Sequence, residues 1–369
     1  MIYRAFLAIR HFLYDKGRKK SFRASVPTVD IGNLAAGGTG KTPHTEMIIR
    51  LLLRSDDWAY SDIAVLSRGY KRKSRGFQKV PMDGTATLYG DEPVQIARKF
   101  PIVTVAVAKD RVEGCRRLAE GADENTAPSK LILLDDAFQY RRLRADMDIV
   151  LTEFGRPIFK DRLLPLGRLR DLPSRIHRAA VTIVTKCPPY IDEWERGKWA
   201  AKLGIDNYST ATYTGTDSKT GKPRMLFFSL IGYLPMEPVF PEADSRYMYS
   251  KRLILLTGIA RSAPLAGHLS DHYSIVREFR FRDHHRFTKA DIRSLEKAVR
   301  SNPTACIATT EKDAQRLLDT KKMPLAIRER LFKVPIEVRF VGEGEDEAFG
   351  KAFLSLLSSA GKDLVLEAD

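Results

Sequence analysis

Cysteine is scarce in this chain of 369 residues: it has three, Cys115, Cys187 and Cys306, which lie far apart and form no Cys-x-x-Cys pair. Neither a disulfide framework nor a zinc site is therefore expected. Such sparse use of cysteine is typical of the reducing cytosol. An uncharged apolar run of about 18 residues is also missing, so we expect no membrane-spanning helix.

Acidic residues are too few to balance the basic ones: 46 Asp and Glu stand against 62 Lys and Arg, which gives a formal charge of +16. A basic chain favours nucleic acid, phosphate-bearing metabolites or anionic lipid as partners. The sequence contains no nucleic-acid recognition motif, so we expect no nucleic acid, and no obligate protein partner is predicted. The length predicts two domains.

The first 24 residues combine helical spacing with positive charge. Ile2, Phe6, Ile9 and Leu13 recur on one helical face, with Phe12 beside them. We expect a short amphipathic helix with a basic tail at an anionic membrane surface. An ordinary helix packed on the core is the alternative. A signal peptide is not expected, because a charge interrupts the apolar residues and no cleavage site follows.

Short β-branched runs alternate with helical patterns through the first two thirds of the chain. The expected strands are residues 26–31, 63–66, 102–106, 131–134, 148–151 and 181–185. This alternation predicts an α/β fold, with a parallel sheet covered by helices on both faces. Ligands of such sheets bind outside the carboxyl ends of the strands.

Four segments are predicted along the chain. Two extended runs at 208–214 and 224–230 flank a turn-rich stretch and indicate a hairpin-like linker, and further strands are expected at 252–257, 275–281 and 306–309. We therefore expect a membrane-surface helix and basic tail at 1–24, a phosphate-loop (P-loop) kinase domain at 25–207, an extended two-strand linker at 208–250, and a second, smaller α/β domain at 251–369.

A glycine-rich string joins the first strand to the first long helix. It reads Ala35, Ala36, Gly37, Gly38, Thr39, Gly40, Lys41 and Thr42. Glycines let the backbone N–H groups curl toward an anion, and the helix N-terminus adds positive charge. Lys41 is expected to reach the β and γ phosphates of ATP, and Thr42 to bind Mg²⁺. Ala35 departs from the usual first glycine, and a Gly-rich turn with an exposed lysine is the alternative.

Two neighbouring classes of P-loop protein are disfavoured. Partitioning-type ATPases carry a second lysine just before the Gly-Gly pair, where this chain has Ala36. Guanine selectivity needs an Asp after the late strand, and the run Thr185-Lys186-Cys187-Pro188 lacks it.

Two carboxylates, Asp135 and Asp136, end an apolar strand. Adjacent acids at that place are costly unless they face a cation, and the Mg²⁺-holding acid of P-loop proteins belongs there. Both are therefore metal candidates, and a helix-capping Asp is the alternative.

The ordered set of motifs resembles the tetraacyldisaccharide 4′-kinases of lipid A biosynthesis. Besides the glycine-rich string and the paired acids, the resemblance rests on Gly32-Asn33-Leu34, Ser67-Arg68-Gly69-Tyr70, Gly90-Asp91-Glu92-Pro93, Lys109-Asp110-Arg111, Ala137-Phe138-Gln139, Leu163-Leu164-Pro165-Leu166-Gly167-Arg168-Leu169-Arg170, Gly258-Ile259-Ala260, Phe281-Arg282-Asp283-His284-His285 and Thr310-Glu311-Lys312-Asp313-Ala314.

The resemblance implies a reaction. ATP with Mg²⁺ would phosphorylate the 4′-hydroxyl of a tetraacylated glucosamine disaccharide 1-phosphate, at the cytoplasmic face of the bacterial inner membrane. A P-loop switch NTPase acting on a protein partner is the alternative, and it predicts hydrolysis without a phosphorylated small molecule.

The resemblance also assigns catalytic roles. Asp91 would accept the proton of the acceptor hydroxyl, and His284 would orient it, although His285 stays open as the partner. Arg170 would stabilise charge on the transferring phosphoryl group, as would Lys41. Asp171 stands where the family has Glu, so a metal role for it needs a bridging water.

Four further residues match positions near the sugar and its phosphate. Tyr70 could stack on the sugar, and Arg111 could pair with an anionic oxygen. Gln139 and Tyr140 are the remaining substrate-binding candidates. The family commonly has His in place of Tyr140, which can donate a hydrogen bond but carries no charge at neutral pH.

Overall fold

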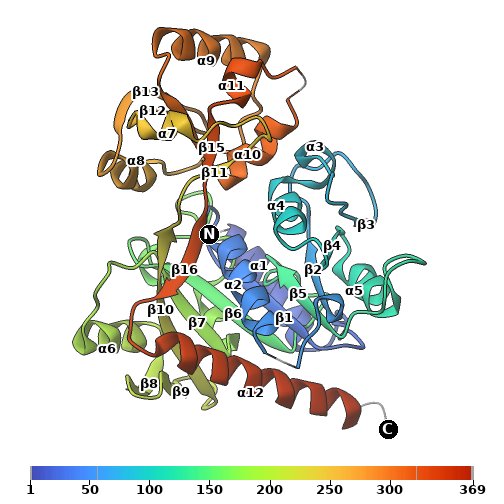
Figure 1. The fold of residues 1–369 in the computed structure, drawn as a ribbon. Helices are drawn as coiled ribbons and strands as arrows, with labels where there is room; N and C mark the ends of the chain where they lie inside the picture. The colour runs from blue at the N-terminus through green and yellow to red at the C-terminus, as the bar shows by residue number, and fades with distance from the viewer. Residues whose placement is uncertain (1, 56, 321, 367–369) are drawn as a thin grey trace.

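The structure is a computed structural model that describes residues 2–55, 57–320 and 322–366. Two α/β domains lie one above the other in Figure 1, joined by a pair of long strands. Residues 1, 56, 321 and 367–369, which belong to the predicted segments, lie outside the described residues.

The larger sheet has eleven strands in the described part of the chain. Its order is β3-β4-β2-β5-β1-β6-β7-β10-β9-β8, with β16 paired to β10, and its centre is parallel. The strands are β1 Thr28–Asn33, β2 Ile63–Ser67, β3 Gln78–Lys79, β4 Thr104–Val107, β5 Leu131–Asp135, β6 Met147–Glu153, β7 Val181–Thr185, β8 Ile205–Ser209, β9 Thr214–Asp217, β10 Pro223–Tyr233 and β16 Ile336–Phe340.

Helices cover both faces of this sheet, which confirms the predicted fold class. Alternate residues of each central strand enter one of two cores: Ile31 and Leu133 pack with α2, α4 and α12, whereas Ile132 and Leu134 pack with α5. The helices are α1 Ile2–Asp15, α2 Lys41–Leu53, α3 Ala86–Tyr89, α4 Asp91–Lys99, α5 Arg111–Glu120, α6 Glu193–Lys202 and α12 Glu345–Leu366, with short 3₁₀ turns at Tyr60–Asp62, Ile158–Lys160 and Pro173–Arg178.

The second domain is built on a five-stranded sheet within the described residues, in the order β11-β15-β14-β12-β13. Its strands are β11 Glu237–Pro238, β12 Arg252–Thr257, β13 Ser274–Arg280, β14 Cys306–Thr310 and β15 Leu331–Val334. Its helices are α7 Arg246–Tyr249, α8 Ala263–Ser270, α9 Lys289–Ser301, α10 Glu311–Leu318 and α11 Leu325–Arg328. Strands β12, β13 and β14 lie within one residue of the ranges expected for them.

The connection between the domains differs from the hairpin expected at 208–250. Strands β8 and β9 extend the larger sheet, and the first half of β10 pairs with β7 inside it. The second half of β10, from Ser229 to Tyr233, pairs antiparallel with β16, more than 100 residues away (Figure 1). Local pattern cannot reveal so distant a pairing, because both halves of β10 are equally extended and apolar.

Helix α12 also differs from the expected boundary at 251. It follows β16 back to the first domain, where Phe349, Phe353 and Leu357 enter the core beside α2 (Figure 1). The start of the helix is fixed by Glu345, which is fully buried. Its carboxylate accepts hydrogen bonds from Arg196 at 2.9 Å and from the backbone N–H groups of Phe228 and Gly342 at 2.6 and 2.7 Å.

We predict that Glu345→Ala strongly destabilises the first domain. The change leaves the Arg196 guanidinium buried without its carboxylate, and breaking one partner of a buried pair costs about 3–5 kcal/mol. Urea denaturation measures the loss.

Glu347→Ala is the matched control, because Glu347 lies exposed on the same first turn. Its effect should stay within about 0.5 kcal/mol. Equal midpoints for the two variants would show that the buried pair does not fix the helix.

Candidate functional site

The glycine-rich loop leaves β1 at Asn33 and enters α2 at Lys41. Gly37 and Gly40 have φ angles of 111° and 95°, which side-chain-bearing residues rarely adopt, so the curl of the loop requires glycine at both positions. Thr42 lies in the first turn of α2, where free backbone N–H groups and the helix dipole favour an anion.

Side chains at the ends of neighbouring strands form hydrogen bonds that hold this loop in place. Asn33 donates to the Thr39 hydroxyl at 2.7 Å, and the Thr185 hydroxyl donates to the Thr39 carbonyl at 2.9 Å. Lys186 hydrogen-bonds the Gly38 carbonyl and pairs with Glu153 at 2.6 Å. The loop therefore keeps its curled shape through contacts made within the protein.

Lys41, Asp136 and Arg170 form a charged cluster at the mouth of the loop. Both terminal nitrogens of Arg170 meet the Asp136 carboxylate, at 3.0 and 2.6 Å, and Lys41 Nζ lies 3.8 Å from it. Burial raises the pKa of Asp136, but the charges of Lys41 and Arg170 outweigh it and lower the pKa. Two cations thus stand beside the loop, where the charge of a terminal phosphate would lie.

Asp135 has the features of a cation ligand. It ends β5, directly between Ile31 of β1 and Ser67 of β2, and its Oδ1 is buried with no hydrogen-bond partner among the described residues. Burial raises its pKa to about 7, assisted by the charge of Glu92 and opposed by Lys41. Within the described residues no three acidic, His or Cys side chains gather to hold a metal alone. Mg²⁺ usually needs only one or two carboxylates, since phosphates and water supply its other ligands.

The second cluster joins the two domains at Asp91, the first residue of α4. His284 Nδ1 lies 3.0 Å from Asp91 Oδ2, and the Arg316 guanidinium reaches the same oxygen at 2.8 and 2.5 Å. Burial raises the pKa of Asp91, but the hydrogen bonds from His284 and Arg316 outweigh it and lower the pKa to about 2. The sequence favoured His284 as the partner of Asp91 but left His285 open; in the structure His285 Nε2 lies 2.9 Å from Asp291 instead.

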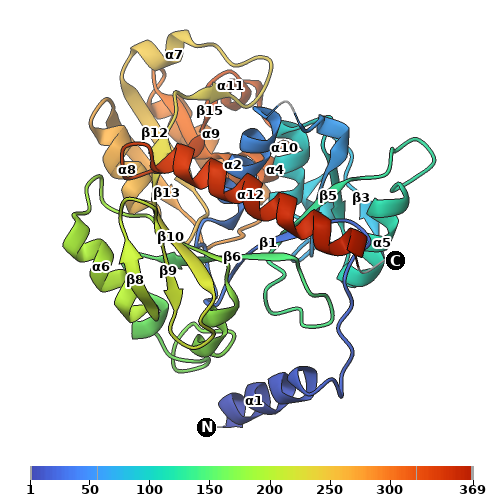
Figure 2. The same ribbon diagram turned by 90° about the horizontal axis from the view of Figure 1, so that it is seen from below.

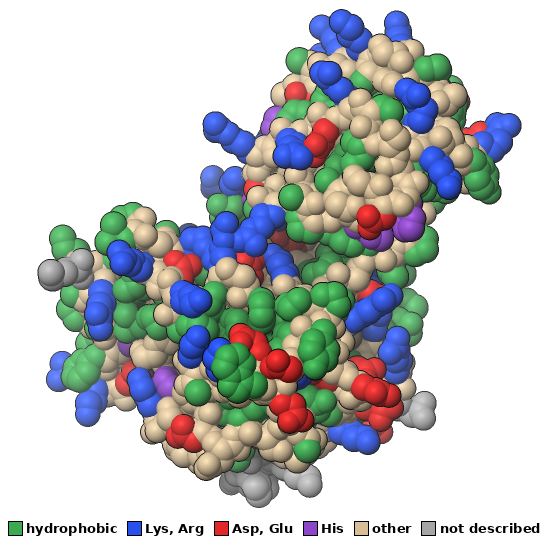
Figure 3. Space-filling view, turned by 90° about the vertical axis from the view of Figure 1, so that its left-hand side faces the viewer, with side chains coloured by type: hydrophobic (Ala, Val, Ile, Leu, Met, Phe, Trp, Pro, Cys, Tyr) green, Lys and Arg blue, Asp and Glu red, His purple; other side chains and the backbone are tan. Residues whose placement is uncertain are grey.

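The two clusters belong to one cleft. Glu92 follows Asp91 on α4, raises the pKa of Asp135 by its charge, and pairs at 3.1 Å with Lys312 of the second domain. Figure 3 shows a waist between the two lobes where Lys and Arg side chains gather. Tyr70 lies at the same place, 57% exposed, with its ring 5.4 Å from that of His284.

Backbone conformation marks the same residues. Asp136, Lys186 and His284 have φ angles of 60°, 56° and 61°, in the left-handed region that residues other than glycine seldom enter. Such strained residues cluster at functional sites, because the surrounding structure must hold them in place.

Other expected site residues lie elsewhere or are already engaged. The Arg111 guanidinium is buried and donates to the carbonyls of Ala108 and Lys109. The Tyr140 hydroxyl donates to Asp110 at 3.0 Å, and the Gln139 amide donates to the Asn33 carbonyl. These contacts keep all three side chains within the protein's own hydrogen-bond network.

Asp171, a metal candidate from the resemblance, contacts helix α1 in the structure. It is completely buried, and its Oδ1 lies 2.5 Å from His11 Nε2 on helix α1 and accepts from the Leu172 N–H at 2.8 Å. Helix α1 thus holds one oxygen of the shorter side chain that replaces the family's Glu, and the other, Oδ2, is buried with no hydrogen-bond partner among the described residues.

Sequence reasoning missed the residues that complete the clusters. Arg316 and Lys312 lie on α10, whose buried residues include charged side chains as well as apolar ones. Asn33, which holds both Arg170 and Thr39, was seen only as part of a motif. A helix of eight residues with four buried polar side chains signals a polar contact, but the sequence does not say with which element.

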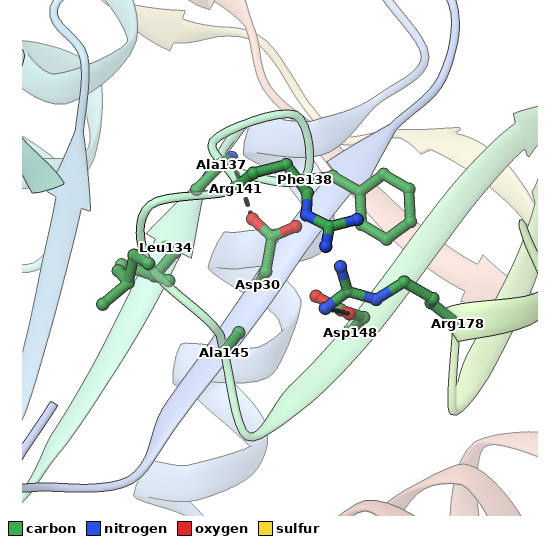
Figure 4. Close-up of a pocket in the computed structure, with 9 residues that line it drawn as sticks. Asp30, Leu134, Ala137, Phe138, Arg141, Ala145, Asp148 and Arg178 are labelled. Carbon is green, nitrogen blue, oxygen red and sulfur yellow. Dashed lines mark hydrogen bonds and ion pairs between the residues drawn. The ribbon is translucent and has the colours of Figure 1, made fainter. Parts of the chain in front are cut away.

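A buried acid pair supports the loop that carries Asp136. Asp30 of β1 and Asp148 of β6 are register partners, and both point into a small cavity of about 10 Å³ (Figure 4). Asp30 Oδ1 accepts a hydrogen bond from the Ala137 N–H at 2.9 Å, which fixes the backbone just after Asp136. Burial raises the pKa of Asp30 well above its ordinary value, and the charge of Asp148 raises it further.

The fold and the cleft define a class. A P-loop at the carboxyl end of a parallel sheet, with a carboxylate of the same domain paired to a histidine of a second domain, is the arrangement of a phosphotransferase that acts on an acceptor between its domains. The family model for tetraacyldisaccharide-1-P 4′-kinase, LpxK, matches residues 1–358. The chain belongs to this family.

Individual relatives agree with this assignment. The tetraacyldisaccharide 4′-kinase of Bacteroides thetaiotaomicron is 35% identical over 359 residues, covering 94% of this chain and 88% of that protein. The enzyme of the same name from Parabacteroides distasonis is 38% identical over 92% of this chain and 88% of its own length. A crystal structure of LpxK from Aquifex aeolicus in complex with ATP matches with a TM-score of 0.68 and 25% identity over 96% of each chain.

We predict that Asp30→Asn stabilises the protein increasingly as pH rises. The pKa of Asp30 is higher in the folded protein than in the unfolded chain, where it is near 3.8. Its contribution to the stability of the fold is therefore complete below pH 3.8, and it is lost as the pH rises through the folded-state pKa. The Asn amide keeps the acceptor for Ala137 and removes the buried charge. Melting temperatures of both proteins between pH 4 and 8.5 measure the effect.

The difference should be near zero at the acid end, which serves as the internal control, and positive by about 2 °C or more at the alkaline end. A difference that does not change with pH would show that Asp30 carries no such penalty.

Proposed function

We propose that this protein transfers the γ-phosphate of ATP to the 4′-hydroxyl of a tetraacylated glucosamine disaccharide 1-phosphate. The observation that carries the proposal is the pairing of Asp91 with His284 across the two domains, at 3.0 Å, on a helix whose next residue, Glu92, acts by its charge on Asp135. Membership of the kinase family supports this choice of donor and acceptor, as does the likeness to an ATP-bound LpxK.

The loop and its cationic cluster form the donor end. Backbone N–H groups around Gly37 to Thr42 cradle the phosphates of ATP, and Lys41 reaches the terminal ones. Arg170 is held in place by Asp136 and Asn33, so its guanidinium is pre-organised beside the phosphoryl group. Fixed cations of this kind stabilise the charge of the transition state without having to reorganise.

Thr42 and Asp135 are the residues that would hold Mg²⁺. The buried, unpartnered Oδ1 of Asp135 and its raised pKa fit a carboxylate that gains a cation when nucleotide binds. When bound, Mg²⁺ neutralises charge on the β and γ phosphates. Asp136 is taken up by Arg170 and Lys41 instead, so its part is to orient these two cations.

Asp91 is the residue that receives the acceptor hydroxyl. Among the described residues, hydrogen bonds from side chains reach its Oδ2, which leaves Oδ1 to accept from the substrate. A carboxylate with a pKa of about 2 is a weak base, but in a loose phosphoryl-transfer transition state the proton leaves late. Orientation of the hydroxyl therefore matters more than basicity, and His284 and Arg316 fix that orientation. Tyr70, beside His284, offers its ring to the sugar.

Helix α1 supplies a surface for the acyl chains and the bilayer. Ile2, Phe6, Ile9 and Phe12 are 89, 60, 61 and 50% exposed, which reverses the usual placement of apolar side chains. Exposed basic residues follow at Lys16, Arg18, Lys19 and Lys20. No helix in the described residues is both long and apolar enough to cross a bilayer. An amphipathic helix with a basic tail would hold the enzyme peripherally on the cytoplasmic face of the inner membrane.

We predict that purified protein phosphorylates the disaccharide 1-phosphate with ATP and Mg²⁺, and that Asp91→Asn and His284→Ala lower kcat by about 10²–10⁴-fold and 10-fold or more, respectively. Both changes remove a side chain that orients the acceptor hydroxyl, and both leave the phosphate loop intact. The KM for ATP should therefore remain close to that of the unchanged enzyme. Steady-state transfer of radioactive phosphate to the lipid measures both constants.

His285→Ala is the matched control: His285 is adjacent but pairs with Asp291, so kcat should stay near the original value. Absence of phosphorylated disaccharide from every preparation would overturn the proposed reaction. Full activity in Asp91→Asn would remove Asp91 from it.

We also predict that Phe6→Ser and Ile9→Ser each weaken binding to vesicles that contain phosphatidylglycerol by roughly 10-fold or more, because burying such a side chain is worth about 1.5–3 kcal/mol. Cosedimentation measures the bound fraction. Tyr249→Ser, at an 81% exposed aromatic side chain of the second domain, is the control and should bind as before. If all three variants sediment alike, α1 is not the membrane contact.

A further inference from the structure

Helix α1 contacts the active-site loops with its polar face. The Tyr3 hydroxyl donates to the backbone carbonyl of Arg170 at 2.8 Å, and the Arg10 guanidinium donates to the carbonyl of Gln139 at 2.8 Å. His11 pairs with Asp171, the residue after Arg170, at 2.5 Å. Figure 2 shows the helix on the outside of the first domain, apart from the helices that cover the sheet. Its contacts are thus directed at the loops of the phosphate-binding site rather than at the core.

The His11 contact is part of a buried chain of hydrogen bonds that engages Oδ1 of Asp171, while its Oδ2 is buried with no partner among the described residues. A carboxylate only accepts, so His11 Nε2 carries the proton that is donated to Asp171, and Nδ1 is free to accept from Arg141 at 3.3 Å. Arg141 also pairs with Asp15, at the end of the same helix, at 2.7 Å. Both His11 and Asp171 are buried, so the loss of either partner leaves the other unpaired away from water.

These contacts determine where the Arg170 backbone lies. Its N–H donates to the Leu34 carbonyl at 2.8 Å, its carbonyl accepts from Tyr3, and the next side chain is held by His11. The Arg170 side chain then reaches Asp136 and Asn33 beside the phosphate loop. A single residue therefore has its backbone fixed by the membrane-facing helix and its guanidinium aimed at the phosphoryl group.

We propose that α1 is a positioning element for Arg170, acting through His11 and Tyr3, so that the rate of phosphoryl transfer depends on the docking of this helix. The inference rests on the role of Arg170 in the function proposed above. His11 and Tyr3 touch neither ATP nor the acceptor; they act through Arg170. The helix that meets the lipid surface thereby also completes the catalytic site.

The test measures kcat and both KM values with the acceptor dispersed in detergent, so that vesicle binding does not enter. His11→Ala should lower kcat by roughly 10-fold or more, since a small misplacement of a catalytic group costs up to about 100-fold. Both KM values should change far less. His11→Gln should restore much of the rate, because its amide can donate to Asp171 and accept from Arg141. Ala8→Ser, an exposed change on the same helix, is the control and should leave kcat unchanged.

A double-mutant comparison separates this inference from the function on which it rests. In an Arg170→Ala background, His11→Ala should cause little further loss, because the group through which His11 acts is already gone. Equal fold losses in both backgrounds would overturn the positioning role. Full activity of Arg170→Ala alone would instead overturn the role given to Arg170.

Should His11→Ala lower the melting temperature too far for assay, Tyr3→Phe carries the same comparison. It removes only the hydroxyl that meets the Arg170 carbonyl. A kcat equal to that of the unchanged enzyme, in both Tyr3→Phe and a folded His11 variant, would likewise refute the proposal.

Discussion

A carboxylate held between two domains is unfavourable unless cations or donors meet it, and Asp91 is met by both His284 and Arg316. These two residues come from the second domain, whereas Asp91 begins a helix of the first. The contact therefore fixes how the domains sit and engages Oδ2 of Asp91 from the side of the second domain. The remaining polar contacts of the α4–α10 interface, among them Lys99 with Glu311 and Lys312 with Glu92, extend the same pairing along the two helices.

The donor end of the cleft is organised by the same physical rule. Asp136 does not stand alone at the end of β5 but is neutralised by Arg170 and Lys41, while Asp135 keeps an unpartnered oxygen beside them. Two adjacent acids thus differ because their surroundings differ: protein cations neutralise Asp136, whereas no described residue pairs with Oδ1 of Asp135. The buried pair of Asp30 and Asp148 lies beneath the loop that makes this distinction possible.

Much of this could be predicted from the sequence, because the central strands and the glycine-rich loop are local patterns. The β-branched runs fell on buried parallel strands, and the fold class followed. The link between Asp91 and His284 came from family motifs, not from physics, since 193 positions separate them. The hydrogen-bond partners of Asp171 and Tyr140 could not be predicted. Asp171 pairs with His11 and Tyr140 with Asp110, and only the folded chain shows that these residues lie close together.

The domain boundary was misplaced for the same reason: the contacts of a segment with distant parts of the chain cannot be read from its own sequence. Residues of β10 and β16 are ordinary extended segments, and only their pairing shows that they form the connection between the domains. Equally, α12 carries apolar residues that would suit either core, and it packs on the first because β16 runs back toward it.

The continuity of β10 has a mechanical consequence. One strand is hydrogen-bonded into the larger sheet through Phe228 and into the β16 ribbon from Ser229 onward, so the larger sheet continues unbroken into the ribbon that leads to the second domain. A two-stranded ribbon resists sliding of one strand past the other, yet it bends and twists readily. Any change in the angle between the domains would therefore bend or twist this ribbon, and Asp91 and His284 lie in the two domains that it joins.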